Sequence, residues 1–461
     1  MSNPPFGFSN SDNDPDRDKD RDGEGSPGQG GIPFGFSPEG FDPAQLGQML
    51  TQFGQMLSGM GSAMGTGGGS GPVNYDVAKK LALQQLGSVT PISTGTAAAV
   101  ADAARLAEVW LDGATTLPAG ASKAVAWTAA DWLDNTLDTW KRLCDPVAEQ
   151  ISGMWVSGLP DEAKEMAGPM MGMLGQMGGL AFGSQLGQAL GQLSSEVLTS
   201  TDVGLPLGPN GVAALLPTAI EKFSEGLEQP HREILVFLAA REAAHHRLYV
   251  HVPWLRQRLL ATVEEYARGI KMDFSAIEEA AQGIDPSALT DPSKIEEILQ
   301  QGAFEPQTTP EQKQALERLE TMLALIEGWV ETVVSEALGD RLPGVGALSE
   351  TLRRRRATGG PAEQTFATLV GLELRPRKVR EASRLWHLLT DSAGIDGRDG
   401  VWAHPDLLPD SSDLDSPAGF VDRVVGGGTS AFEDPIAQLL ATEAREREEG
   451  RAAGDPEEPK D

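Results

Sequence analysis

The sequence predicts a mainly α-helical protein, with one large helical body between two disordered tails. Apolar residues recur at spacings of three and four through most of the middle of the chain, which is the period of an amphipathic helix. Runs that alternate apolar and polar residues, as strands do, are few. The 54 glycines and 31 prolines of the 461 residues concentrate near the N-terminus. The remainder therefore has the composition of a globular domain.

Both ends of the chain are expected to be disordered. Residues 1–73 alternate acidic runs with glycine-rich tracts, and they hold too few large apolar residues to offset the entropy of ordering. Within this tail, residues 41–57 (FDPAQLGQMLTQFGQML) carry large apolar residues at helical spacing, which predicts one short amphipathic helix suited to docking. Residues 431–461 are rich in charged and small residues, which predicts an acidic tail.

The helical body is predicted to cover residues 74–430, in a part 74–200 and a part 201–430. In the first part the helix-like segments are residues 73–87, 94–117, 121–151 and 167–198. The last of these is rich in Met, Gly and Ala, which indicates a tightly packed pair of core helices. In the second part the helix-like segments are residues 231–254, 256–270 and 309–339, and a closing globular stretch covers residues 348–424.

The composition excludes several classes of function. A formal net charge of -30 repels phosphate, so neither nucleic acid nor an anionic membrane surface is an expected partner. No apolar run is long enough to span a bilayer, and no basic and apolar leader opens the chain, so a cytoplasmic location is expected. Cys144 is the only cysteine, which excludes an intrachain disulfide and a cysteine-based zinc cluster.

The stretch REAAHHRLY carries the main candidate site. A zinc peptidase helix reads H-E-x-x-H, because histidines one turn apart reach the same ion and the glutamate holds the attacking water as general base. Here Glu242 and His245 stand in the right places, but Arg241 occupies the first ligand position, on the same helix face as His245. A guanidinium cannot ligate, since it stays protonated, and it repels a nearby dication.

Two other arrangements remain open from the residues alone. In a shifted register Glu242 pairs with His246 at i, i+4, or with His245 at i, i+3, and carboxylates from elsewhere complete the metal site. The best source is the segment ALIEGWVETVV, where Glu327 interrupts an apolar helical face and Glu331 lies one turn on. A carboxylate among apolar side chains is costly unless it is paired, so we expect a cationic partner for Glu327.

Several long phrases carry a resemblance to a known family. They are REAAHHRLYVHVPWLRQRL, EGWVETVV, LVGLELRPRKVREASRLW and GVWAHPDLLPDSSDLDSPAGFVDRV. Together, over about residues 74–425, they resemble an actinobacterial family of zincin-like proteins described as zinc-dependent metalloproteases or hydrolases. The resemblance implies a mostly helical, zincin-like fold and a zinc cofactor. It implies that Glu242 is the general base and that His245 and Glu327 are zinc ligands, while Arg241 breaks the pattern.

Two functions are compatible with a zincin-like sequence that has Arg241 at the first ligand position. The first is a hydrolase of the metalloprotease family with a degenerate H-E-x-x-H site. The second is a non-catalytic binding or scaffold protein that receives a peptide or protein partner in the zincin-like cleft. For the second we hypothesise that Arg241 replaces the metal and pairs with Glu327, with Glu242 or His245 completing the network. The basic run at residues 353–356 is interpreted as a solvated helix face.

Overall fold

The fold consists mainly of long α-helices, as the sequence predicts. The computed structural model describes residues 71–157, 168–269, 309–357, 365–367, 369 and 377–426. These residues all lie in one compact unit of the chain, which begins at Gly67. The predicted helix at 41–57 and the tail 431–461 lie outside the described residues, as does nearly all of the tail 1–73.

Most of the long helices overlap the expected segments, whereas α7 was not expected, and two 3-10 turns, η2 and η3, occur in the C-terminal part. Their bounds are α2 Tyr75–Leu86, α3 Thr94–Leu111, α4 Ala129–Ser157, α6 Gly168–Glu196, α7 Pro217–Ser224, α8 His231–His251, α9 Leu255–Arg268, α12 Pro310–Leu338, α13 Val345–Ala357, α15 Val379–Gly400, η2 Val401–Ala403, η3 Pro405–Leu407, α16 Ser411–Asp415 and α17 Pro417–Gly426.

Local signals explain where the helices begin. At α12 the hydroxyl of Thr309 accepts a hydrogen bond from the Gln312 amide (3.2 Å), and the Gln312 side chain accepts one from the Thr309 amide (3.0 Å). This reciprocal capping box, followed by proline at the first helical position, satisfies amides that the helix leaves unpaired. At α2 the Asn74 side chain accepts from the Val77 amide (3.0 Å) in the same way.

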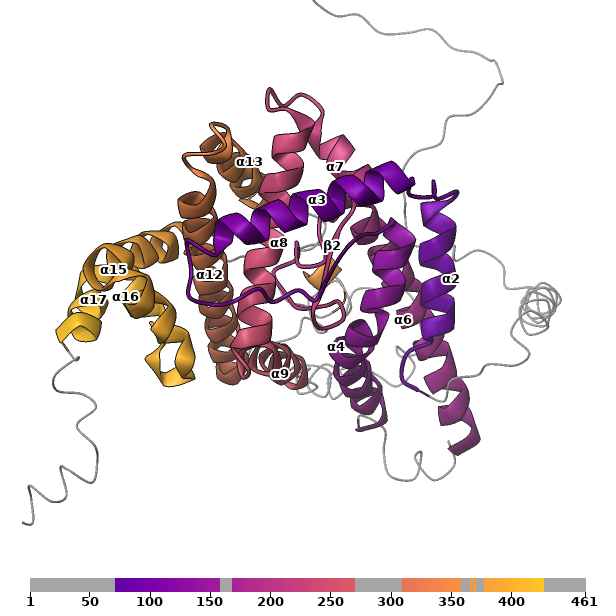
Figure 1. Cartoon of the computed structure of the whole chain (residues 1–461). Helices are drawn as coiled ribbons and strands as arrows, with labels where there is room; N and C mark the ends of the chain where they lie inside the picture. The colour runs from indigo at the N-terminus through magenta and orange to yellow at the C-terminus, as the bar shows by residue number, and fades with distance from the viewer. Residues whose placement is uncertain are drawn as a thin grey trace, which may run out of the picture. The chain divides into compact units, whose positions relative to one another are not determined.

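Helix α8 lies at the centre of the described part, between α3 and α12 (Figure 1). Its residues are buried without interruption from Ile234 to Tyr249. A helix that is buried all round belongs to a core rather than to a surface. Polar side chains on α8 therefore have to find their partners inside the protein.

Helix α6 is one continuous helix, so the expected pair of helices over residues 167–198 is wrong. Its glycines do allow the expected close approach to a neighbour. A Cβ atom at Gly183 would lie 2.4 Å from the Asn74 oxygen, and one at Gly187 would lie 2.6 Å from the Ala78 oxygen. Helix α2 thus packs directly on the α6 backbone, which only glycine at these positions permits.

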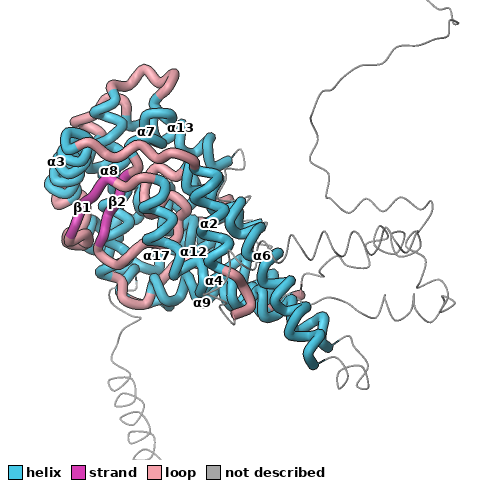
Figure 2. The backbone as a smooth tube through the Cα atoms, turned by 90° about the vertical axis from the view of Figure 1, so that its right-hand side faces the viewer, coloured by secondary structure: helices cyan, strands magenta, loops and turns pink. Residues whose placement is uncertain are grey.

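A two-stranded parallel sheet crosses next to α8, as Figure 2 shows. Strand β1 (Lys123–Ala126) pairs with β2 (Val212–Leu215), with Lys123 opposite Val212 and Ala126 opposite Leu215. The prediction of one helix over residues 121–151 is therefore wrong at its start. Pairing with β2, which is distant in the sequence, decides the conformation of β1 against a helix-like local pattern. Just before β1, Gly120 lies against α8, where a Cβ atom would sit 2.1 Å from the His246 oxygen.

A buried charge network fixes α15 to the rest of the domain. Asp399 accepts hydrogen bonds from the Thr115 hydroxyl (2.6 Å) and from the Trp329 indole of α12 (2.9 Å). The neighbouring Arg398, which is fully buried, donates to Asp399 (2.8 Å) and to the Ala114 carbonyl (2.6 Å). Both charges are paired, so this interior network stabilises the junction of three chain segments.

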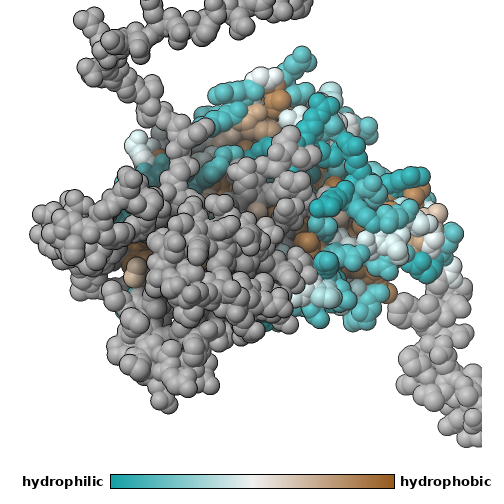
Figure 3. All heavy atoms as spheres, turned by 180° about the vertical axis from the view of Figure 1, so that it is seen from behind, coloured by the Kyte–Doolittle hydropathy of each residue, from teal (hydrophilic) through white to brown (hydrophobic). Residues whose placement is uncertain are grey.

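Among the described residues, no helix has both the length and the apolar character needed to cross a bilayer. On the face drawn in Figure 3 the described residues are mainly hydrophilic, with hydrophobic residues scattered among them. Scattered apolar side chains are normal on a protein surface.

Candidate functional site

The candidate site lies on the buried face of α8 that contains Arg241, Glu242, His245 and His246. All four residues are buried, with relative exposures of 8, 1, 2 and 5 %, respectively. Glu327, which α12 contributes, is 2 % exposed. Charged groups buried to this extent require partners of opposite charge or several hydrogen bonds.

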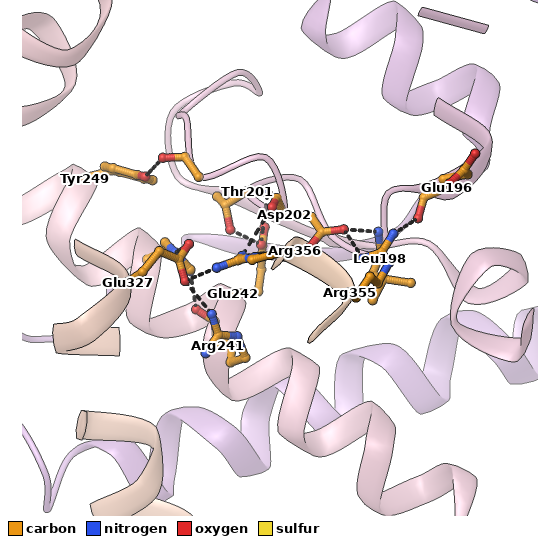
Figure 4. A network of polar contacts seen from close by, with 12 residues as sticks. Glu196, Leu198, Thr201, Asp202, Arg241, Glu242, Tyr249, Glu327, Arg355 and Arg356 are labelled. Carbon is orange, nitrogen blue, oxygen red and sulfur yellow. Dashed lines mark hydrogen bonds and ion pairs between the residues drawn. The ribbon is translucent and has the colours of Figure 1, made fainter. Parts of the chain in front are cut away.

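Arg241, His245 and Glu327 meet in one cluster. Figure 4 shows the contact between Arg241 and Glu327. The Nη2 atom of Arg241 donates to Glu327 Oε2 at 2.6 Å, and His245 Nε2 lies 3.1 Å from Glu327 Oε1. His245 Nδ1 lies 2.8 Å from the Arg241 carbonyl oxygen. Both atoms that face the His245 ring are acceptors, so a ring that donates from both nitrogens satisfies both contacts.

A third cation reaches the same carboxylate. Arg356, near the end of α13, forms an ion pair with Glu327 Oε2 and donates to the Asp202 carbonyl (3.2 Å). Its neighbour Arg355 donates to the Asp202 carboxylate at 3.0 Å and to the Glu196 carbonyl at 2.5 Å. The interpretation of residues 353–356 as a solvated face is therefore wrong for these two arginines. Arg354, whose side chain is 77 % exposed, fits it.

The charges of the cluster shift the pKa values of its members. Burial alone would raise the pKa of Glu327, but Arg356, His245 and Arg241 lower it well below its ordinary range. Burial lowers the pKa of the Arg241 guanidinium, while Glu327 opposes this effect and Arg356 adds to it. Glu327 is thus ionised and holds two guanidinium groups at once.

Glu242 faces a different set of partners. Its Oε2 atom accepts from the Thr201 hydroxyl (2.5 Å) and amide (3.2 Å). Its Oε1 atom accepts from the Ser200 hydroxyl, from the Ala214 amide of β2 (3.2 Å) and from His246 Nε2 (3.2 Å). Both carboxylate oxygens are engaged, so Glu242 ties the loop before β2 and the strand itself to α8.

The remaining candidates are not gathered into one metal site. The Nε2 atom of His246 forms a hydrogen bond with Glu242, and its Nδ1 atom is buried without a partner among the described residues. Glu331 accepts a hydrogen bond from Arg353 at 2.8 Å, away from His246. Within the described ranges, no group of three or more His, Cys, Asp and Glu side chains is placed to hold a metal ion.

The donor set does not fit the zinc ion that the resemblance implies. His245 Nε2 and Glu327 Oε1 are neighbours, as two ligands of one ion would be. A zinc site needs three protein ligands, and a guanidinium stands at the third position. A dication about 5 Å from each of two guanidiniums would be repelled by several kcal/mol at an effective dielectric near 20.

Glu242 predicts a specific pH dependence of stability. Burial would raise its pKa, but the hydrogen bond and charge of His246 and the bonds from Ser200 and Thr201 lower it from 4.5 to about 2. Its contribution is therefore complete above pH 4.5 and is lost as the pH falls toward 2. Linkage puts this contribution at about 3 kcal/mol. In urea unfolding, Glu242→Gln should have a lower free energy of unfolding than the native protein, and this difference should be smaller near pH 3 than at neutral pH. An equal difference in the free energy of unfolding at both pH values would contradict this role of Glu242.

Sequence reasoning missed Arg356, Ser200 and Thr201 as members of the site. The basic run was visible, but nothing in its spacing indicated that its last two arginines turn inward. Ser200 and Thr201 lie in a loop, where no periodicity reports which way a side chain points. The only available signal was general, since a buried carboxylate on α8 needs donors from some other segment.

Comparisons with known proteins agree with the fold. A family model described as zincin-like metallopeptidase matches residues 73–421. A solved structure from Chloroflexus aurantiacus, described as a "putative hydrolase with a novel fold", superposes with a TM-score of 0.54 at 18 % identity. The match covers 76 % of this chain and 98 % of that chain, and at this identity it speaks for the fold alone. The comparison with curated proteins gave no match.

Proposed function

Because this chain belongs to the zincin-like metallopeptidase family, we propose that it is a metal-independent member of that family, which binds a peptide or protein segment in the zincin-like cleft without hydrolysing it. One observation carries the proposal. The carboxylate that would ligate zinc, Glu327, is paired at 2.6 Å with Arg241, the residue at the first ligand position.

The residue at the position of the general base, Glu242, also has structural partners. A general base must hold a water molecule or take a proton from it within hydrogen-bond reach. Glu242 stands where that base would be, but both of its oxygens already accept hydrogen bonds from the 200–201 loop, β2 and His246. With its pKa lowered to about 2, it is also a weak base.

A metal-dependent hydrolase is the second candidate. The family description and the neighbour's description as a hydrolase favour it, and His245 and Glu327 lie close enough to share an ion. For metal to enter, Arg241 would have to swing away and Arg356 would have to release Glu327. Family membership concerns the fold, whereas catalysis depends on the residues of the site, and these favour the binding function.

Metal content separates the two candidates. The full chain, purified without chelator, incubated with excess zinc and desalted, is expected to carry far less than one zinc per chain by mass spectrometry. Its melting temperature should be the same with zinc and with chelator, since a ligand that does not bind cannot stabilise. Near-stoichiometric zinc in the native protein, lost in both His245→Ala and Glu327→Ala, would establish the hydrolase site instead.

A further inference from the structure

The buried guanidinium of Arg241 has unused hydrogen-bonding capacity. An arginine carries five N–H donors. Among the described residues, the only partner of this guanidinium is Glu327, through Nη2. The side chain of Arg241 is 10 % exposed, so a small part of it is accessible to solvent. Its remaining N–H groups can therefore donate to an additional acceptor.

The guanidiniums around Arg241 also outnumber the carboxylates that pair with them. Arg241 and Arg356 share the single carboxylate of Glu327. The next carboxylate, Asp202, is paired with Arg355 at 3.0 Å and lies 4.0 Å from Arg356. Three guanidiniums, those of Arg241, Arg355 and Arg356, thus share only two carboxylates, Glu327 and Asp202.

The two guanidiniums come together from different elements. Arg241 projects from α8 and Arg356 from the end of α13, and both contact the same oxygen, Glu327 Oε2 (Figure 4). Arg356 is 28 % exposed, so it forms the outer side of the site, while Arg241 forms the inner side. On another side, the carbonyl of Gly204 accepts a hydrogen bond from Tyr249 at 2.8 Å, which holds this loop residue close to Glu327.

We propose that Arg241 and Arg356 form a binding site for a carboxylate, supplied by the C-terminus of a peptide or by an acidic side chain. A planar carboxylate matches the fork of a guanidinium and accepts several hydrogen bonds at once. The inference rests on the proposed function, because it gives the ligand class of the same metal-free cleft.

Three labelled hexapeptides of alanine and glycine test the site with the full-length protein. One has a free C-terminus, one is amidated, and one is amidated but carries glutamate as its last residue. Fluorescence anisotropy is expected to show at least tenfold tighter binding of the free acid or of the glutamate peptide than of the plain amide. The difference between the two acidic peptides identifies the source of the carboxylate. Acetate should compete with either one.

Matched arginine variants show whether the named residues are responsible. Arg356→Gln should abolish the preference for the acidic peptides, whereas Arg354→Gln, on the same helix but 77 % exposed, should retain it. Arg356 is partly exposed, so its loss is compatible with folding, which circular dichroism checks. Equal binding of acid and amide, no binding of any peptide, or equal loss in both variants would overturn the proposal. Zinc is measured in the same samples, so a zinc-loaded protein refutes the proposed function, while a zinc-free protein without acid preference refutes only this site.

Discussion

Glu327→Ala is expected to lower the free energy of unfolding by about 3–5 kcal/mol, because it leaves buried guanidinium charge without its counterion. Arg241 and Arg356 both depend on this carboxylate, and Arg241 has no other acceptor for its guanidinium among the described residues. If the proposed metal-independent function is right, the loss should be the same with chelator and with zinc, because the ion pair with Glu327 then takes the place of a metal. Urea unfolding followed by circular dichroism measures it.

Glu331→Ala is the matched control for this effect. Glu331 lies one turn further along α12 and also pairs with an arginine, Arg353, at 2.8 Å. That pair is more exposed, at 14 % for the acid and 32 % for the arginine, so its loss should cost about 1 kcal/mol or less. If the two alanine variants lost the same stability, Glu327 would not be the essential counterion of two buried guanidiniums.

The second large effect concerns metal binding. The double variant Arg241→His, Arg356→Gln is expected to take up close to one zinc per chain, whereas the native protein takes up almost none. The imidazole introduced at position 241 stands one turn from His245 on the same helix face. Removing both guanidiniums frees Glu327, and three protein ligands then surround the position of the ion, as a catalytic zinc site requires.

One single change and one control variant sharpen this test. Arg241→His alone should remain poor in zinc, because Arg356 still pairs with Glu327. Arg241→His combined with Arg354→Gln should behave like the single variant, since Arg354 pairs only with Glu350 in the described part of the chain. Zinc uptake by Arg241→His alone would show that Arg356 does not block the site. A zinc-free double variant would show that His245 and Glu327 are no longer positioned for a metal.

The helical architecture and the centre of the site could be predicted from the sequence. The periodic segments and the cap at Thr309 act within a few residues, so they appear directly in the sequence. The need of Glu327 for a cation could also be predicted, because a carboxylate in an apolar helical stripe has few other solutions. Arg241 was the available candidate, since it stands at the ligand position of the H-E-x-x-H pattern.

Other features depended on contacts between distant segments. Arg241 and Glu327 are 86 residues apart, and only the packing of α8 against α12 brings them to 2.6 Å. The strand at residues 123–126 forms because β2 lies beside it, against a locally helix-like pattern. Arg356 turns inward because α13 ends next to Glu327 and Asp202. None of these contacts could be predicted from the periodicity of the sequence.

The sequence by itself determined that this chain is mainly helical, that Arg241 stands where an H-E-x-x-H pattern has its first histidine, and that a second helix carries a carboxylate in need of a cation. Tertiary structure alone decided that two arginines share that carboxylate and that Glu242 is enclosed by the 200–201 loop and β2. The physical reason is range. Helix propensity and capping act over one or two turns, whereas the partners of a buried charge are chosen by which surfaces pack together.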